Sequence, residues 1–259
     1  MCDEQKKKQD QELVYNYRDW ENFCKYLSNE NRYILNDEYK KLTEEILKLA
    51  EDREAFLEQG SMFWRARTSK IPRVTEDGAI DSDSYTAEEM SACQEEDTKD
   101  GRANPTGISY LYLAENIETA IAEIRPYIGD KITAASFVLS RKIKIVDIRQ
   151  GAPSLPEAVF SKNKDSFDNL WFGIKMYFSM PVKPQDPKGY IPMQYVAELF
   201  KNNGFDGIKF DSVQREGNFN LVLFNPSDVR LNNMVERHIK KIEYYDHLRF
   251  LNECLEKQK

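Results

Sequence analysis

The sequence predicts an α+β fold, with a mixed or antiparallel β-sheet, flanking helices and a helical N-terminal extension. Short segments rich in β-branched and aromatic residues recur between residues 61 and 224. Only a few helical segments separate them, which favours a mixed or antiparallel sheet over a doubly wound parallel one. The first 58 residues instead carry apolar residues at helical spacing.

Residues 1–58 are predicted to form a helical hairpin that packs on the main domain, with a partner-binding arm as the alternative. In its second helix, apolar residues recur at helical spacing between residues 42 and 50. Asn36 or Asp37 is the expected N-cap, and Gly60 the expected end.

The main domain is predicted to cover residues 59–232. Its strand-like segments are residues 61–67, 108–114, 133–140, 143–148, 205–212 and 218–224, and its helical segments are residues 117–124, 166–179 and 192–204. Gly204 is the expected C′ glycine of the last of these helices. Residues 72–105 are polar, acidic and aperiodic, so they are predicted to form a long surface loop. Residues 233–259 carry an apolar stripe and are predicted to form a C-terminal helix.

Composition narrows the functional classes. The 259 residues are 41% hydrophobic, enough for one sizeable core. A net charge of -7 argues against a general nucleic-acid-binding surface but permits a local basic cleft for an anionic small molecule. No stretch of about 18 apolar residues exists, so no membrane span is expected.

The cysteines and histidines limit the available chemistry. The four cysteines are scattered singly, which is typical of free thiols in the reducing cytoplasm, and no secretion signal is visible. With only His238 and His247, a zinc site or a Ser-His pair is not expected. We therefore predict no metal.

Glu123 is the first candidate for chemistry. It lies at the edge of an apolar helical face formed by Ile117, Ala120, Ile121 and Ile124. A carboxylate at a cleft edge can stabilise developing positive charge, and a solvated rim carboxylate is the simpler alternative.

Two arginines are candidates for binding an anion. Arg102 lies in "GRANPTG", a turn in which its guanidinium can bind a phosphate through two hydrogen bonds. Arg65 alternates with Phe63 on a predicted strand, so both side chains are expected to point inward; Arg67 shares that face and competes with it. For Arg102, a surface position is the alternative.

Tyr112 and Ser212 complete the candidates. Tyr112 lies on a strand, where core packing is the alternative. Ser212 follows another strand and has no histidine near it in the sequence, so we interpret it as a hydrogen-bonding group or turn residue rather than a nucleophile.

Three blocks in this order resemble the RES domain family: an arginine on an early strand, "GRANPTG" with "LYLA" and "TAIAEIRP", and "GYIPMQYVAELFKNNGFDGIKFDSVQREGNFNLVLFNP". The resemblance spans about residues 61–226. Two departures, Met193 and Ala103, touch no presumed catalytic group. The resemblance implies catalytic roles for Arg65, Tyr112 and Glu123 and substrate-binding roles for Arg102, Asn104 and Ser212.

Characterised members of this family are bacterial toxins that destroy NAD. The resemblance implies a fold similar to ADP-ribosyltransferase toxins and cleavage of the nicotinamide–ribose bond of NAD, with NAD as substrate and no cofactor. The arginines would hold the pyrophosphate, Tyr112 would stack on nicotinamide, and Ser212 would bind the carboxamide or ribose. The expected partner is an antitoxin with a helix-turn-helix domain, and a homo-oligomer stays open.

Two other functions stay open. An ADP-ribosyltransferase would modify a protein or nucleic acid, but many arginine-modifying members carry Glu or Gln two residues before the catalytic glutamate, where this chain has Ile121. The second alternative function is that of an inactive nucleotide-binding module. For control of activity, we expect the acidic loop near residues 72–100 to cover the arginines, with a solvated loop as the alternative.

Overall fold

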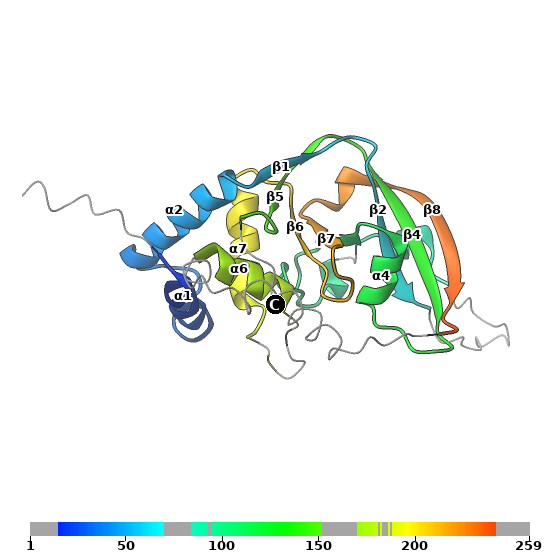
Figure 1. The fold of residues 1–259 in the computed structure, drawn as a ribbon, viewed down its shortest axis with the longest axis horizontal. Coiled ribbons are helices and arrows are strands. Elements are labelled where there is room, and N and C mark those ends of the chain that lie inside the picture. Colours follow the sequence, from blue (N-terminus) through cyan, green and yellow to red (C-terminus); the bar gives the residue numbers. More distant parts are fainter. Residues whose placement is uncertain are drawn as a thin grey trace, which may run out of the picture.

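The computed structural model describes residues 15–69, 84–92, 95–151, 170–180, 182, 186 and 188–241. Its strands are β1 (Glu54–Leu57), β2 (Met62–Thr68), β3 (Leu111–Ala114), β4 (Lys131–Leu139), β5 (Ile143–Asp147), β6 (Gly207–Asp211), β7 (Phe219–Leu223) and β8 (Val229–His238). They form one sheet in the order β1-β5-β6-β7-β3-β2-β4-β8 (Figure 1). Only β5 and β6 pair in parallel, so the predicted α+β fold with a mixed sheet is confirmed.

The helices are α1 (Tyr17–Asn29), α2 (Asp37–Glu51), α3 (Ala87–Met90), α4 (Ile117–Glu123), α6 (Leu170–Ser179) and α7 (Ile191–Asn202), with short 3₁₀ turns at Glu95–Asp97 and Pro226–Asp228. Asn36 caps α2, as predicted, because its side-chain oxygen accepts from the Tyr39 amide at 2.9 Å. Gly204 follows α7 with φ +81°, the left-handed conformation expected of a C′ glycine.

Three local predictions were wrong. Helix α2 ends at Glu51 rather than near Gly60, and residues 54–57 form the edge strand β1, whose backbone pairs with β5. Residues 233–238 belong to β8 rather than to a C-terminal helix, because pairing with β4 satisfies their backbone groups; residues 242–259 lie outside the described part.

The third correction concerns the predicted loop at residues 72–105, of which residues 72–83 and 93–94 are outside the described part. The remainder is not purely surface loop. It contains α3, whose Thr86 and Glu89 form a capping box, and Met90 is fully buried. Met90 therefore anchors this polar segment to the core, and Tyr85 packs against the same cluster.

Two short connections force the sheet to curve. Residues 140–142 join β4 to β5, and residues 58–61 join β1 to β2, although each joined pair is five positions apart in the sheet order. Five strand spacings in a flat sheet measure about 24 Å, whereas the chain from Leu139 to Ile143 reaches about 14 Å. The two ends of the sheet must therefore approach each other at this corner.

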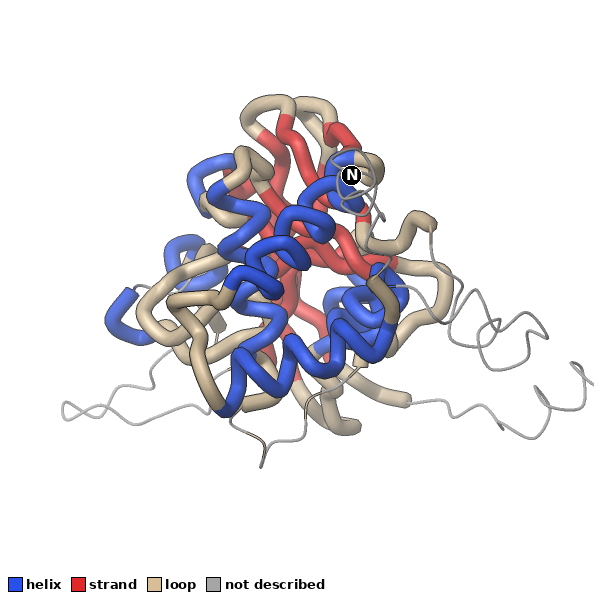
Figure 2. The backbone as a smooth tube through the Cα atoms, turned by 90° about the vertical axis from the view of Figure 1, so that its left-hand side faces the viewer, coloured by secondary structure: helices blue, strands red, loops and turns tan. Residues whose placement is uncertain are grey.

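The curve gives the sheet two different faces. One face gathers side chains from distant strands, such as Ile145 of β5 and Phe137 of β4, into a cluster that Met90 helps to close. The opposite face carries the helices: α1, α2, α6 and α7 gather beside β5 and β6, and α4 lies against β2 and β4 (Figure 1). Figure 2, viewed from the left-hand side of Figure 1, shows the group of α1, α2, α6 and α7 in front of the strands.

The N-terminal helices are part of this layer. Trp20 of α1 is fully buried and makes an edge-on contact with Tyr177 of α6, with ring centres 5.6 Å apart. Gly173 of α6 permits this approach, since a Cβ there would lie 2.4 Å from the Trp20 ring. Cys24 of the same helix is a buried free thiol. Within the described ranges, no helix is both long and apolar enough to cross a membrane.

One arginine fastens the corner of the sheet. Arg141 Nη2 lies 2.7 Å from Asp206 Oδ1 before β6 and 2.7 Å from Asp228 Oδ2 before β8, and its Nε donates to Asp228 Oδ1 at 2.8 Å. Asp228 is 5% exposed, so its carboxylate depends on this partner.

We expect Arg141→Ala to lower the free energy of unfolding by about 1–3 kcal/mol, because it leaves the Asp228 carboxylate buried without its guanidinium. The matched control is Lys142→Ala, which removes an exposed ion pair with Glu58 and is expected to cost less than about 1 kcal/mol. Urea unfolding measures both variants, and equal costs would contradict the role given to Arg141.

Candidate active site

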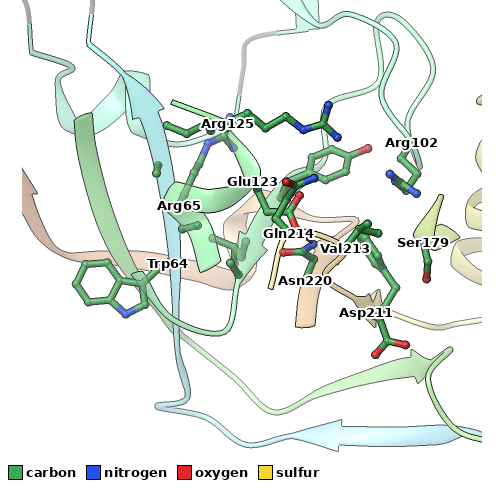
Figure 3. Close-up of a pocket in the computed structure, with 17 residues that line it drawn as sticks. Trp64, Arg65, Arg102, Glu123, Arg125, Ser179, Asp211, Val213, Gln214 and Asn220 are labelled. Carbon is green, nitrogen blue, oxygen red and sulfur yellow. Dashed lines mark hydrogen bonds between the residues drawn. The ribbon is translucent and has the colours of Figure 1, made fainter. Parts of the chain in front are cut away.

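A cavity of about 300 Å³ opens on the helical face of the sheet, between α4 and the end of α6 (Figure 3). Its charged and amide side chains are Arg65, Arg102, Glu123, Arg125, Asp211, Gln214 and Asn220. The remaining walls include Trp64, Tyr112 and Phe210. The lining thus combines aromatic surface, three arginines and two carboxylates, within the size range of small-molecule sites.

Glu123 is held in place by two hydrogen bonds, one from the residue that follows β6 and one from β7. Its Oε1 accepts from Ser212 Oγ at 2.6 Å and from Asn220 Nδ2 at 2.7 Å. Both donors are buried, at 6% and 8% exposure, whereas Glu123 itself is exposed at the cavity. No described residue donates to Oε2. The carboxylate is therefore oriented by the protein while it stays accessible to a ligand.

Strand pairing brings these groups together. Asn220 of β7 lies opposite Ala114 of β3 on one side and Phe210 of β6 on the other. Ser212 follows β6 directly. At the other end of α4, the N-cap Asn116 donates from Nδ2 to Asn218 Oδ1 at 2.6 Å. The hairpin of β6 and β7 thus fastens α4 at both ends.

The turn that carries Arg102 is tied to β3. Tyr112 Oη donates to Asn104 Oδ1 at 2.8 Å and accepts from the Ala103 amide at 2.9 Å. Gln194 Nε2 of α7 donates to the carbonyls of Gly101 and Asn104, both at 3.1 Å. Burial raises the pKa of Tyr112 to about 12, so its hydroxyl stays protonated and able to donate.

Arg102 closes the end of α6. Its Nη1 donates to the carbonyls of Tyr177 at 3.3 Å, of Met180 at 3.0 Å, and of Phe178. The last carbonyls of a helix generally lack partners within it, and a cation satisfies them. The guanidinium also lies 5.6 Å from the centre of the Phe210 ring. Burial lowers the pKa of Arg102, although the side chain still lines the cavity.

The structure separates the competing arginines. Arg65 lines the cavity, whereas the guanidinium of Arg67 lies 5.2 Å from the centre of the Tyr85 ring. No described residue of the acidic segment 84–100 lines the cavity, and the rest of that segment lies outside the described part. The covering loop stays a prediction.

The structure brings four of the predicted residues, Arg65, Arg102, Tyr112 and Glu123, to one cavity. The other two, Asn104 and Ser212, lie behind its wall. Asn104 is 3% exposed and uses its side chain on Tyr112 and on the carbonyls of Lys99 and Pro105. Ser212 contacts Glu123 from behind, so both residues support the lining.

Sequence reasoning missed Asn220, Arg125 and Gln214. Asn220 had a signal, because an amide inside the apolar run "NLVLF" must find a hydrogen-bond partner when buried. Arg125 and Gln214 looked like ordinary surface residues. Among the described residues, no group of His, Cys, Asp and Glu side chains has the arrangement of a metal site.

Comparisons with known proteins place these residues in context. The family model described as the RES domain matches residues 70–244, which include Arg102, Tyr112, Glu123 and Ser212 but begin after Arg65. A solved structure titled "Crystal structure of the M.tuberculosis MbcT-MbcA toxin-antitoxin complex" contains a chain that is 13% identical, with a TM-score of 0.42. The alignment covers 74% of this chain and 92% of that chain. No curated protein matches.

We expect Tyr112→Phe to lower the free energy of unfolding by about 1–3 kcal/mol, because the buried Asn104 oxygen and Ala103 amide lose their shared partner while the ring remains. Tyr127→Phe is the matched control, since Tyr127 is 79% exposed. Urea unfolding of both variants tests this, and a Tyr112→Phe variant as stable as the control would show that the hydroxyl does not hold the turn.

Proposed function

The chain belongs to the RES domain family, and from this membership we propose that it degrades NAD by breaking the bond between nicotinamide and ribose. The observation that carries the proposal is Glu123, an accessible carboxylate fixed by Ser212 and Asn220 beside three cavity arginines. A fixed anion next to a cationic wall suits a substrate that carries a diphosphate and develops positive charge on its sugar.

The proposed chemistry follows from charge. Nicotinamide leaves as a neutral base, so the ribose acquires oxocarbenium character in the transition state. The Glu123 carboxylate then gains more attraction than it had in the ground state, which is the condition for catalysis. The hydrogen bonds to Oε1 hold the carboxylate in one orientation, so it need not reorganise as the charge develops.

The other residues take distinct roles in this proposal. Arg65 and Arg102 bind the pyrophosphate through charge-assisted hydrogen bonds. The ring of Tyr112 forms the wall beside nicotinamide, while its hydroxyl holds the turn that carries Arg102. Ser212, expected from the resemblance to touch the ligand, is assigned here to positioning Glu123, because its hydroxyl already donates to that carboxylate.

The acceptor of the ADP-ribose group is water in a glycohydrolase and inorganic phosphate in a phosphorylase. Ile121 stands where many arginine-modifying transferases carry an acceptor-orienting side chain, which favours a small acceptor. As for other RES toxins, the proposal includes a cognate antitoxin with a helix-turn-helix domain and action in the cytoplasm, without direct binding to nucleic acid.

Incubation with NAD tests the reaction directly. Nicotinamide with free ADP-ribose identifies hydrolysis, and nicotinamide with ADP-ribose 1″-phosphate, formed only when phosphate is present, identifies phosphorolysis. Labelled protein or nucleic acid would identify a transferase instead. Intact NAD after prolonged incubation with purified, folded protein would refute the proposed activity.

We expect Glu123→Gln to lower kcat about 10²–10³-fold, because the neutral amide no longer stabilises the ribose cation. The fold should persist, since the glutamine oxygen can still accept from Ser212 and Asn220. Glu118→Gln, an exposed change in the first turn of the same helix, is the matched control. Turnover with circular dichroism measures both, and near-normal turnover of Glu123→Gln would remove Glu123 from the mechanism.

We expect Arg65→Ala and Arg102→Ala to raise the Kd for NAD about tenfold or more, because each removes charge-assisted hydrogen bonds to the diphosphate. Ser212→Ala should change it less than about threefold, because Ser212 lies behind Glu123. Calorimetric titration on a Glu123→Gln background keeps the ligand intact, and urea unfolding controls for the contact between Arg102 and α6. If Ser212→Ala weakens binding most, the arginines do not hold the diphosphate.

A further inference from the structure

Arg125 has an unusual backbone conformation. Among the described residues it is the one non-glycine with positive φ, at +48°. It follows Ile124, the C-cap of α4, and its amide donates to the Ala122 carbonyl at 3.0 Å. Glycine is the usual residue at this position of a helix end, because its lack of a Cβ permits the left-handed conformation. An arginine there accepts backbone strain without a gain for the helix.

The conformation directs the Arg125 side chain into the cavity. Arg125 belongs to the lining, and in the view of Figure 3 its side chain extends past Glu123, away from Arg65. With its amide oriented to suit its neighbours, Gln214 accepts from Arg125 Nη2 at 3.1 Å and from Nε at 3.2 Å. Gln214 lies two residues after Ser212, so one loop steadies both Arg125 and Glu123.

The cavity around Arg125 carries more positive than negative charge, which favours the binding of an anion. No described carboxylate pairs with Arg125. Of the two carboxylates in the lining, Asp211 Oδ2 lies 3.4 Å from Lys175 Nζ, and Glu123 is bonded to Ser212 and Asn220. Arg125 and Arg102 are also close enough to repel each other electrostatically. A ligand phosphate between the two guanidinium groups would relieve that repulsion.

We infer that Arg125, steadied by Gln214, is a further ligand-binding residue that grips a phosphate group together with Arg102. The inference rests on the proposed function for the identity of the ligand. Two sources offer the same chemistry: the diphosphate of the dinucleotide, and inorganic phosphate acting as acceptor. A planar guanidinium forms two parallel hydrogen bonds to phosphate, which explains an arginine where glycine would relieve strain.

The test uses Arg125→Gly, because binding and stability should then respond in opposite ways. Titrations in phosphate-free buffer use ADP-ribose, which keeps the diphosphate and is not cleaved. We expect its Kd to rise about tenfold or more, while the urea midpoint stays unchanged or rises because the strain is gone. Arg125→Lys should bind with intermediate affinity, since it keeps the charge without the planar fork. Arg32→Gly, an exposed loop change of equal charge, should bind normally.

A second arm separates the sources of phosphate. If Arg125→Gly weakens the binding of ADP-ribose, the residue binds the dinucleotide's diphosphate. If it weakens only the binding of inorganic phosphate, measured by titration of phosphate alone, the residue binds the acceptor. Unchanged affinity for both overturns the inference, as does a lower urea midpoint that accounts for the loss. A chain that binds ADP-ribose through Arg125 but leaves NAD intact refutes the proposed reaction alone. A parent chain that binds neither ligand overturns the inference, and incubation with NAD then decides the proposed reaction separately.

Discussion

The architecture depends on a sheet whose two ends are joined by connections too short for a flat arrangement. Because β4 leads to β5 through residues 140–142, the sheet must bend, and Arg141 fastens that corner to Asp206 and Asp228. The face with side chains from both ends becomes the inner one. Helices on the outer face rest on diverging surfaces, so α6 and α4 leave a cavity between them. The site is therefore a consequence of the curvature, with loops adding detail.

Orientation, more than burial, distinguishes the central carboxylate. Glu123 is exposed, and its attachment comes from β6 and β7, two neighbouring strands that also hold the start of α4 through Asn218. A seven-residue helix is too short to hold its own position in water, so tertiary contacts must fix it. Fastening both ends of α4 sets the carboxylate in place while leaving one of its oxygens toward the cavity. Such preorganisation is what electrostatic stabilisation of a transient cation requires.

The sequence predicted what local patterns determine. The strand segments rich in β-branched and aromatic residues, the Asn36 cap and the Gly204 terminus each depend on neighbours in sequence, and each is present in the structure. The hydrogen bond between Ser212 and Glu123 joins residues 89 positions apart, and it depends on sheet order, which no local pattern contains. Residues 233–238 were wrongly predicted as helix, because their apolar spacing suits a helix as well as a strand. Pairing with β4 decides between the two, and that pairing is tertiary.

The N-terminal helices lie outside the segment that matches the family, yet they reach the cavity through one intermediary. Trp20 packs against α6 where Gly173 lets it approach, and Arg102 donates to carbonyls in the last turn of α6. Because Arg102 is bonded to the end of α6 and also lines the cavity, its position depends on the contacts that hold α6 in place. Helix α6 is packed against α1, so the extension contributes to fixing the helix end to which Arg102 donates. The helical extension therefore contacts the proposed anion site through α6, although it lies outside the segment that matches the family.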